Sequence, residues 1–95
     1  MAFMDIIQLI KSKICNSINV VDIQIIDESA KHADHYFAPS PSHLKLILVS
    51  DDFMNMASLK RHKLIYNLLR DEIKLIHAIS LHLYTQKEYN LKNQR

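Results

Sequence analysis

The stretch His43-Leu44-Lys45-Leu46-Ile47-Leu48 decides the fold of this chain. Its leucines occupy every second position, and an apolar residue at every second position predicts a strand with one buried face. The same alternation occurs upstream in Val21-Asp22-Ile23-Gln24-Ile25. A third strand is predicted at residues 77–84, where His77 falls on the same face as three apolar residues. Together the three segments predict a small sheet with one face in the core.

Segments with the patterns of helices precede, separate and follow these strands in the chain. Isoleucines at intervals of three and four residues predict an amphipathic helix over residues 4–17. A second helix is predicted from an N-cap at Ser58 to about Ile73. Its expected buried face consists of Leu59, Tyr66, Leu69 and Ile73, with Leu64, Ile65 and Leu68 beside them. Thr85 and Glu88 have the spacing of a capping box, which predicts a short terminal helix. The order αββαβα predicts an α+β fold, a three-stranded sheet covered on one face by helices.

The composition indicates one ordinary globular domain. The chain has 95 residues, of which 48% are hydrophobic and 23% are charged, and this is enough to bury a single core without a cofactor. We expect the domain to occupy residues 1–90, followed by a polar C-terminal tail at residues 91–95. Glycine is absent, which excludes the glycine-rich phosphate-binding loops of nucleotide enzymes. No stretch approaches about 18 consecutive apolar residues, so we expect a cytoplasmic protein without membrane association.

The single cysteine, Cys15, has no partner for an internal disulfide or a dithiol site. It lies beside the apolar stripe of the first predicted helix, where a half-buried, unreactive thiol is expected. Without a dithiol, a catalytic dyad or a nucleotide loop, the chain is expected to bind rather than to catalyse.

Six histidines in so short a chain suggest a metal site, because neutral imidazole is a ligand for iron, zinc and copper. His32 and His35 lie in residues 27–42, a segment rich in turn-forming residues that is predicted to be a long loop. A histidine on an apolar strand face, such as His77, is by pattern alone more often a core residue than a ligand. The other histidines in predicted elements are expected to serve packing, hydrogen bonding or solvation: His43, His62 and His82.

Five short motifs, in this order, resemble the BolA-like family. They are Asp27-Glu28-Ser29 with His32, Ser42-His43, Val49-Ser50-Asp51 with Phe53, Arg61-His62 with Tyr66, and His77-Ala78 with Tyr84-Thr85. The resemblance extends from about residue 10 to about residue 89. It implies a class II KH-like α+β fold, which agrees with the order of the predicted elements.

The resemblance also implies a function. BolA-like proteins are known as partners of monothiol glutaredoxins, with which they share a bridging [2Fe–2S] cluster in iron–sulfur cluster assembly, trafficking or iron signalling. The family's constant ligand histidine corresponds to His77, and its loop ligand corresponds to His32, with His35 as the alternative. The glutaredoxin thiolate and glutathione would supply the other two ligands. A non-enzymatic accessory protein in a heterodimer is therefore implied.

DNA binding is the rival function, because some bacterial members of the family are described as transcriptional regulators of the stress response. Lys60, Arg61 and Lys63 on the second predicted helix could neutralise phosphates and make binding salt-dependent. KH domains, however, hold the nucleic-acid backbone with a GxxG loop. Asn55 and Ala57 stand in the corresponding region of this chain, so DNA binding is the less favoured alternative.

Overall fold

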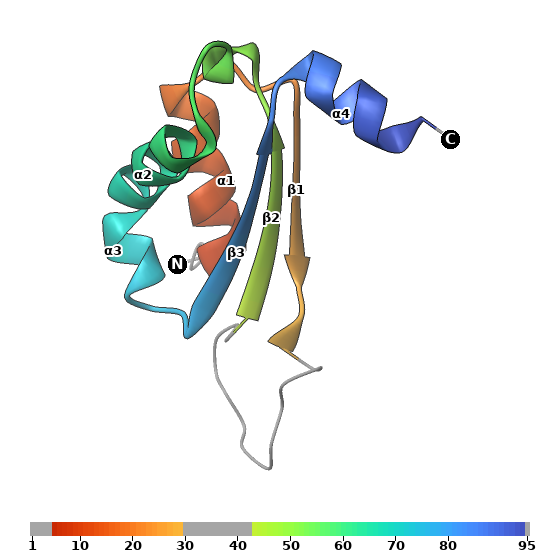
Figure 1. Cartoon of the computed structure of the whole chain (residues 1–95). Helices are drawn as coiled ribbons and strands as arrows, with labels where there is room; N and C mark the ends of the chain where they lie inside the picture. Colours follow the sequence, from red (N-terminus) through yellow and green to blue (C-terminus); the bar gives the residue numbers. More distant parts are fainter. Residues whose placement is uncertain (1–4, 30–42, 95) are drawn as a thin grey trace.

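The computed structural model describes residues 5–29 and 43–94 and shows a three-stranded sheet with helices packed on one face (Figure 1). In chain order the elements are α1 (Ile6–Ser17), β1 (Asp22–Asp27), β2 (His43–Val49), the 3-10 helix η2 (Asp51–Phe53), α2 (Ser58–Leu68), α3 (Arg70–Ile73), β3 (Ala78–Tyr84) and α4 (Gln86–Asn93). The predicted α+β order is confirmed, with η2 and α3 as short additions. Among the described residues, no helix is long and apolar enough to cross a membrane.

The sheet has the order β1-β2-β3, so β2 is central. β1 and β2 are antiparallel, whereas β2 and β3 are parallel, and Leu46 lies opposite both Ile25 and Leu81. A parallel pair needs a crossover connection, which η2, α2 and α3 provide. All three predicted strands are confirmed, although β3 begins at Ala78, one residue after His77.

The core lies between the sheet and the helices α1 and α2. Leu46 and Leu48 of β2 are fully buried, and Ile10 and Ile14 of α1 pack in the same cluster. Burial contributes about 2 kcal/mol for each such side chain. The periodicity predicted for α1 is therefore confirmed. Its first turn is fixed by the Asp5 carboxylate, which accepts hydrogen bonds from two backbone N–H groups.

The second predicted helix is broken in two. Ser58 is the first residue of α2, not its N-cap, and the actual N-cap, Ala57, makes no side-chain capping bond. The helix does not continue to Ile73, because Leu69 departs from helical geometry, with φ −101° and ψ 20°, and separates α2 from α3. Lys13 of α1 and Glu72 of α3 form an ion pair of 3.0 Å that ties the two helices together.

The predicted buried face of α2 is partly wrong. Three of its members are exposed at the surface: Leu59 (66%), Leu64 (38%) and Tyr66 (42%). Ile65 and Leu69 are buried as predicted, and with the buried Arg61 they form a stripe at intervals of four residues. A pattern of apolar residues could not reveal this stripe, because its first member is an arginine that is buried with its hydrogen-bond partners.

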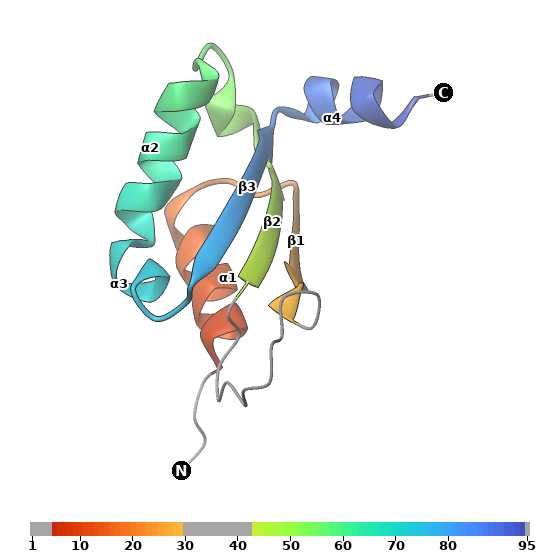
Figure 2. The same cartoon turned by 60° about the horizontal axis from the view of Figure 1, so that its bottom comes forward.

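The helix α4 lies on the opposite side of the sheet from α1, α2 and α3 (Figure 2). It opens with the predicted capping box, in which the Thr85 hydroxyl and the Glu88 carboxylate each accept a backbone hydrogen bond from the other residue. It ends at Asn93, so residues 91–93 of the expected polar tail are helical, and their side chains are exposed.

Candidate metal-binding edge of the sheet

Two histidines meet at one end of the sheet. His43 is the first residue of β2, and His77 directly precedes β3. Because the two strands are parallel and His43 pairs with Ala78, both histidines lie at the same end. Their ring centroids are 5.1 Å apart, and their ring planes are inclined by 57°. We call the end of the sheet that carries His43 and His77 the histidine edge.

The two imidazoles differ in exposure. His77 is exposed and His43 is half-buried. The prediction that His77 shares the apolar face of its strand is therefore wrong, because the residue precedes the strand and is open to solvent. An exposed imidazole does not pack in the core, and its ring nitrogens are accessible to a metal ion.

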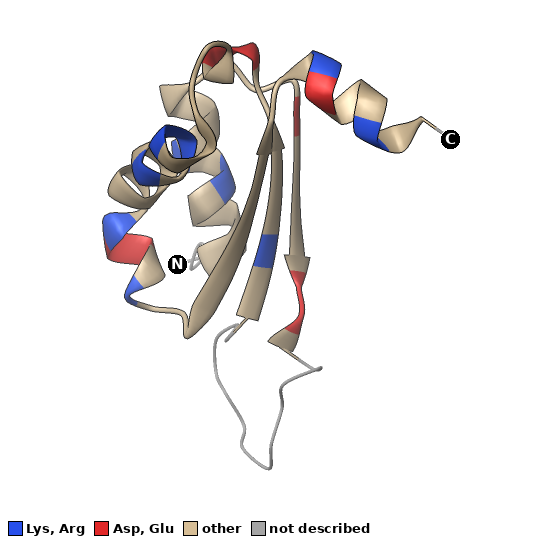
Figure 3. Ribbon diagram, in the orientation of Figure 1, with Lys and Arg blue, Asp and Glu red and all other residues tan. Residues whose placement is uncertain are grey.

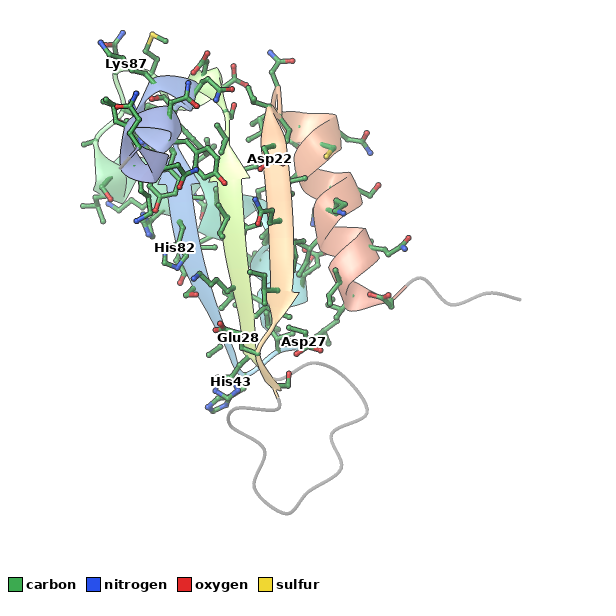
Figure 4. All side chains as sticks on the ribbon, turned by 90° about the vertical axis from the view of Figure 1, so that its right-hand side faces the viewer. Asp22, Asp27, Glu28, His43, His82 and Lys87 are labelled. Carbon is green, nitrogen blue, oxygen red and sulfur yellow. The ribbon has the colours of Figure 1, made fainter. Side chains whose placement is uncertain are left out.

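The end of β1 reaches the histidine edge as well, since β1 is antiparallel to β2. The backbone N–H of Glu28 donates to the carbonyl of His43 at 2.8 Å, and the N–H of His43 lies 3.3 Å from the hydroxyl of Ser29. Figure 4 shows Asp27, Glu28 and His43 together at this end. Hydrogen bonds from the side chain and then the backbone of Ser29 hold the pKa of Asp27 below its ordinary value. The chain thus enters and leaves residues 30–42 at the histidine edge.

The other predicted ligands, His32 and His35, lie outside the described residues. Within the described ranges, no group of three or more His, Cys, Asp or Glu side chains is placed to hold a metal ion. The pair formed by His43 and His77 supplies two nitrogen donors of the kind that iron, zinc and copper accept. The histidine edge therefore brings two imidazoles close together at one end of the sheet.

The contact between His43 and His77 was not predicted from the sequence. Each residue stands at the start of a predicted strand, so a parallel, in-register pairing of the second and third strands would have revealed the contact. That pairing is not visible in either segment alone, because period-two alternation carries no information about which strand lies beside which.

The three residues of the predicted basic cluster on α2 differ in their exposure to solvent. Lys60 and Lys63 are exposed, whereas Arg61 is only 9% exposed. Figure 3 shows that α2 and α3, in the helical layer beside the sheet, carry several basic positions. Lys60 and Lys63 are accessible to a phosphate, and Arg61 is directed into the structure.

Arg61 joins α2 to β3 and α4. Its Nε donates to the carbonyl of Met56 at 2.9 Å, and its Nη1 donates to the carbonyl of Leu83 at 3.2 Å. Its two terminal nitrogens also bind both carboxylate oxygens of Glu88, at 2.6 Å and 3.1 Å. The guanidinium lies 5.6 Å from the centroid of the Phe53 ring. All these contacts are intramolecular, which indicates a structural role for Arg61.

The turn that precedes α2 has a left-handed residue. Asn55 has a φ of 65°, which among the described residues makes it the sole residue with positive φ. Asn55 is also one of the two residues that stand in the region corresponding to the GxxG loop of KH domains. Glycine takes this left-handed conformation without strain, and asparagine tolerates it better than most other residues.

Two further residues can be placed. His62 directs its Nδ1 to the carbonyl of Ser58 at 2.9 Å, which confirms the expected hydrogen-bonding role. Cys15 is exposed on α1, so the expectation of a half-buried thiol is wrong.

A family model and two known proteins of similar sequence indicate the same family. The family model described as "BolA-like protein" matches residues 14–88. The chain is 39% identical over 92 residues to the DNA-binding transcriptional regulator BolA of Haemophilus influenzae, covering 96% of this chain and 87% of the relative. It is 40% identical over 81 residues to the Escherichia coli protein of the same description, covering 84% of this chain and 75% of the relative.

A solved structure is also similar. The BolA domain of SufE1 from Arabidopsis thaliana superposes with a TM-score of 0.79 at 35% sequence identity, covering 92% of this chain and 99% of that domain.

Proposed function

The chain belongs to the BolA-like family, and from this premise we propose that it is a non-enzymatic accessory protein that pairs with a monothiol glutaredoxin and co-ligates a bridging [2Fe–2S] cluster. We propose further that it does so in the cytoplasm, in cluster assembly and trafficking or in iron signalling. The observation that carries the proposal is the histidine edge, where His77 is exposed beside His43.

We assign His77 and His32 as the two ligands from this chain, with His35 as the alternative to His32. Three residues of extended chain span at most about 11 Å. His32 follows Ser29 by three residues, so chain length permits it to reach the histidine edge. One glutaredoxin thiolate and the thiolate of glutathione complete a four-ligand set. Replacing thiolate by neutral imidazole raises the reduction potential of such a cluster, as in Rieske centres.

His43 supports His77 in this proposal. Its ring is half-buried, and its backbone is held by Glu28 and Ser29 of the neighbouring strand, so it offers a fixed surface against which the exposed ring of His77 can rest. Ligand orientation by neighbouring groups typically changes metal affinity by about 10- to 100-fold.

The test is an anaerobic titration of this chain into a cluster-loaded monothiol glutaredoxin with glutathione, followed by visible absorption, circular dichroism and mass. A one-to-one complex with a changed cluster spectrum is expected. The variant His77→Ala should lose the changed spectrum while remaining folded. His82→Ala is the matched control, because it removes an imidazole from the middle of β3. An unchanged spectrum with His77→Ala would remove His77 from the ligand set.

Single variants distinguish the remaining histidines. His32→Ala is expected to abolish the spectrum of the heterocomplex, and His35→Ala is expected to leave it unchanged. His43→Ala should retain the spectrum with cluster loading weakened about 10-fold. Loss of the spectrum in His43→Ala, together with its retention in His32→Ala, would instead make His43 the second ligand.

DNA binding is the second candidate, favoured by two relatives that are named as DNA-binding transcriptional regulators and by the exposure of Lys60 and Lys63. If these lysines contact phosphates, the double variant Lys60→Gln/Lys63→Gln should reduce the slope of log affinity against log salt by about 1.8. Arg61 is left out of the test because its guanidinium is held inside the protein. An unchanged slope would contradict a role for this helix in DNA binding.

A further inference from the structure

The sheet has two outer strands, β1 and β3, and they differ in what covers their free edges. The N–H of Glu28 donates to the carbonyl of His43, which continues the register of β1 and β2, so every second residue of β1 directs its backbone groups to β2. The residues between them, Ile23, Ile25 and Asp27, direct their N–H and C=O groups outward. Within the part of the chain that the structure describes, no backbone group outside the sheet bonds to Ile23 or Ile25.

The edge of β3 is closed by a side chain. Ser50 donates to the carbonyl of Tyr84, so the carbonyl of the preceding residue, Leu83, points away from β2. Arg61 donates to this carbonyl at 3.2 Å from its buried position on α2. A strand added at β3 would displace Arg61 from that contact, whereas among the described residues no such contact blocks β1. The edge of β1 is therefore the one that can accept another strand.

The helix α1 extends beyond the edge of β1. Figure 4 looks onto the sheet and shows β3, β2, β1 and α1 in this order across the view. Figure 1 shows α1 on the same side of the sheet as α2 and α3. A strand added at β1, about 4.8 Å away from it, would therefore lie over α1 and not over solvent.

The flank of α1 beneath this position is partly apolar. Lys13 points to α3, with which it forms an ion pair. Ile7 and Lys11 lie on the opposite flank of the helix and line a depression in its surface. Ile7 is partly buried against the core, as are Ile23 and Ile25 of β1. The remaining surface of these three isoleucines borders the place of an added strand.

We propose that the edge of β1 binds an extended segment of a partner protein as a fourth strand, with apolar side chains at alternate positions. The backbone of the segment bonds to Ile23 and Ile25, and its apolar side chains pack on α1 around Ile7. An extended polypeptide presents donors and acceptors at the spacing of a strand edge, which a nucleic acid does not. The proposal needs no metal at the histidine edge.

A second copy of this chain fits the same edge poorly. Two β1 strands paired antiparallel around Ile25 would place Asp22 of one copy opposite Glu28 of the other, and like charges directly opposite each other are destabilising. Both copies would also bring α1 to the same side of the joined sheet, into the place that the added strand covers. A single extended segment brings no helix with it.

The test is an NMR titration of the full ¹⁵N-labelled chain with the blocked peptide Lys-Val-Thr-Val-Thr-Val-Lys, up to about 5 mM, where a complex with a Kd of about 1 mM is mostly formed. The amide shifts are expected on β1 and α1. Two further peptides carry one N-methyl group each, on the central valine or on the threonine that follows it. Alternate N–H groups of an added strand face opposite ways, so one methylated peptide should bind at least fivefold more weakly and the other should bind like the parent. All three peptides have the same charge, so charge cannot produce this difference.

Two variants of α1 locate the peptide. Ile7→Gln should weaken the binding at least threefold, because the side chain of Ile7 lies beneath the added strand. Leu9→Gln is the matched control and should leave the binding unchanged, because Leu9 is 36% exposed and lies one turn before Lys13, on the flank that faces α3. The spectrum of each variant without peptide verifies its fold.

Three results would overturn the proposal: equal binding of the two methylated peptides, shifts confined to β3 or α2, or an absence of shifts. Shifts of the β1 amides when the chain is concentrated without peptide would assign the edge to a second copy instead.

Discussion

Arg61 makes several contacts that a substitution would remove. Two backbone carbonyls and the Glu88 carboxylate accept hydrogen bonds from its guanidinium, and the side chain is only 10% exposed. We predict that Arg61→Ala lowers the free energy of unfolding by about 3 kcal/mol, because it removes the donors to the carbonyls of Met56 and Leu83 and opens a space beside Phe53. Urea denaturation measures this loss. Lys60→Ala, its exposed neighbour, is the control and should change stability by less than about 0.5 kcal/mol. Equal effects of the two substitutions would contradict a structural role for Arg61.

Substitutions at Asn55 test the backbone conformation of this residue rather than a side-chain contact. Its φ of 65° is a conformation that costs a residue with a β-carbon about 1 kcal/mol, less for asparagine and nothing for glycine. We predict that Asn55→Ala destabilises the protein by about 1 kcal/mol and that Asn55→Gly is neutral within about 0.5 kcal/mol. Thermal unfolding of the three proteins provides the comparison. A destabilising glycine together with a neutral alanine would show that the asparagine side chain, and not its φ, is required.

The attachment of the element α4 to the rest of the fold should depend on pH. Hydrogen bonds from Arg61, then from the backbone of Thr85, lower the pKa of Glu88 from 4.5 to about 2. Because the folded pKa lies below the unfolded one, this carboxylate stabilises the fold above pH 4.5, and the contribution is lost as the pH falls towards about 2. The side chain is 46% exposed, so solvent screening makes the contribution smaller than the shift alone implies.

We therefore predict that wild type is more stable than Glu88→Gln at pH 7 and that the difference shrinks between pH 4.5 and about pH 2. Urea denaturation across this range gives the difference at each pH. Lys87→Gln, a change of charge on the adjacent exposed residue, should show no such convergence. A difference that stays constant with pH would mean that the ion pair with Arg61 does not stabilise the fold.

The elements differ in how far the sequence could predict them. The strands and α1 were predictable because each presents a clear apolar repeat to a single core. The break at Leu69 was not, because apolar residues continue through it and the helical pattern does not record a local change of φ and ψ. The burial of Arg61 was also unpredictable, since its guanidinium is paired with Glu88, which lies 27 residues away in the chain.

At the scale of the whole molecule, the candidate site depends on topology. His77 was identifiable through the family resemblance, but its contact with His43 required the parallel pairing of β2 with β3. The accessibility of His77 was unpredictable for a related reason. Strand alternation predicts a face, but it does not locate the residue at which the strand starts.

The histidine edge lies outside the core, so substitutions at the edge and in the core are expected to change the free energy of unfolding by different amounts. His77 is exposed at the end of the sheet, whereas Leu46 is fully buried at its centre, opposite Ile25 and Leu81. We predict that Leu46→Ala costs about 2–5 kcal/mol, through lost burial and a cavity, and that His77→Ala costs less than about 0.5 kcal/mol. Urea denaturation of both variants measures the two costs on the same scale. A large cost for His77→Ala would mean that the exposed imidazole supports the fold, and a changed cluster spectrum in that variant could then no longer be attributed to ligation.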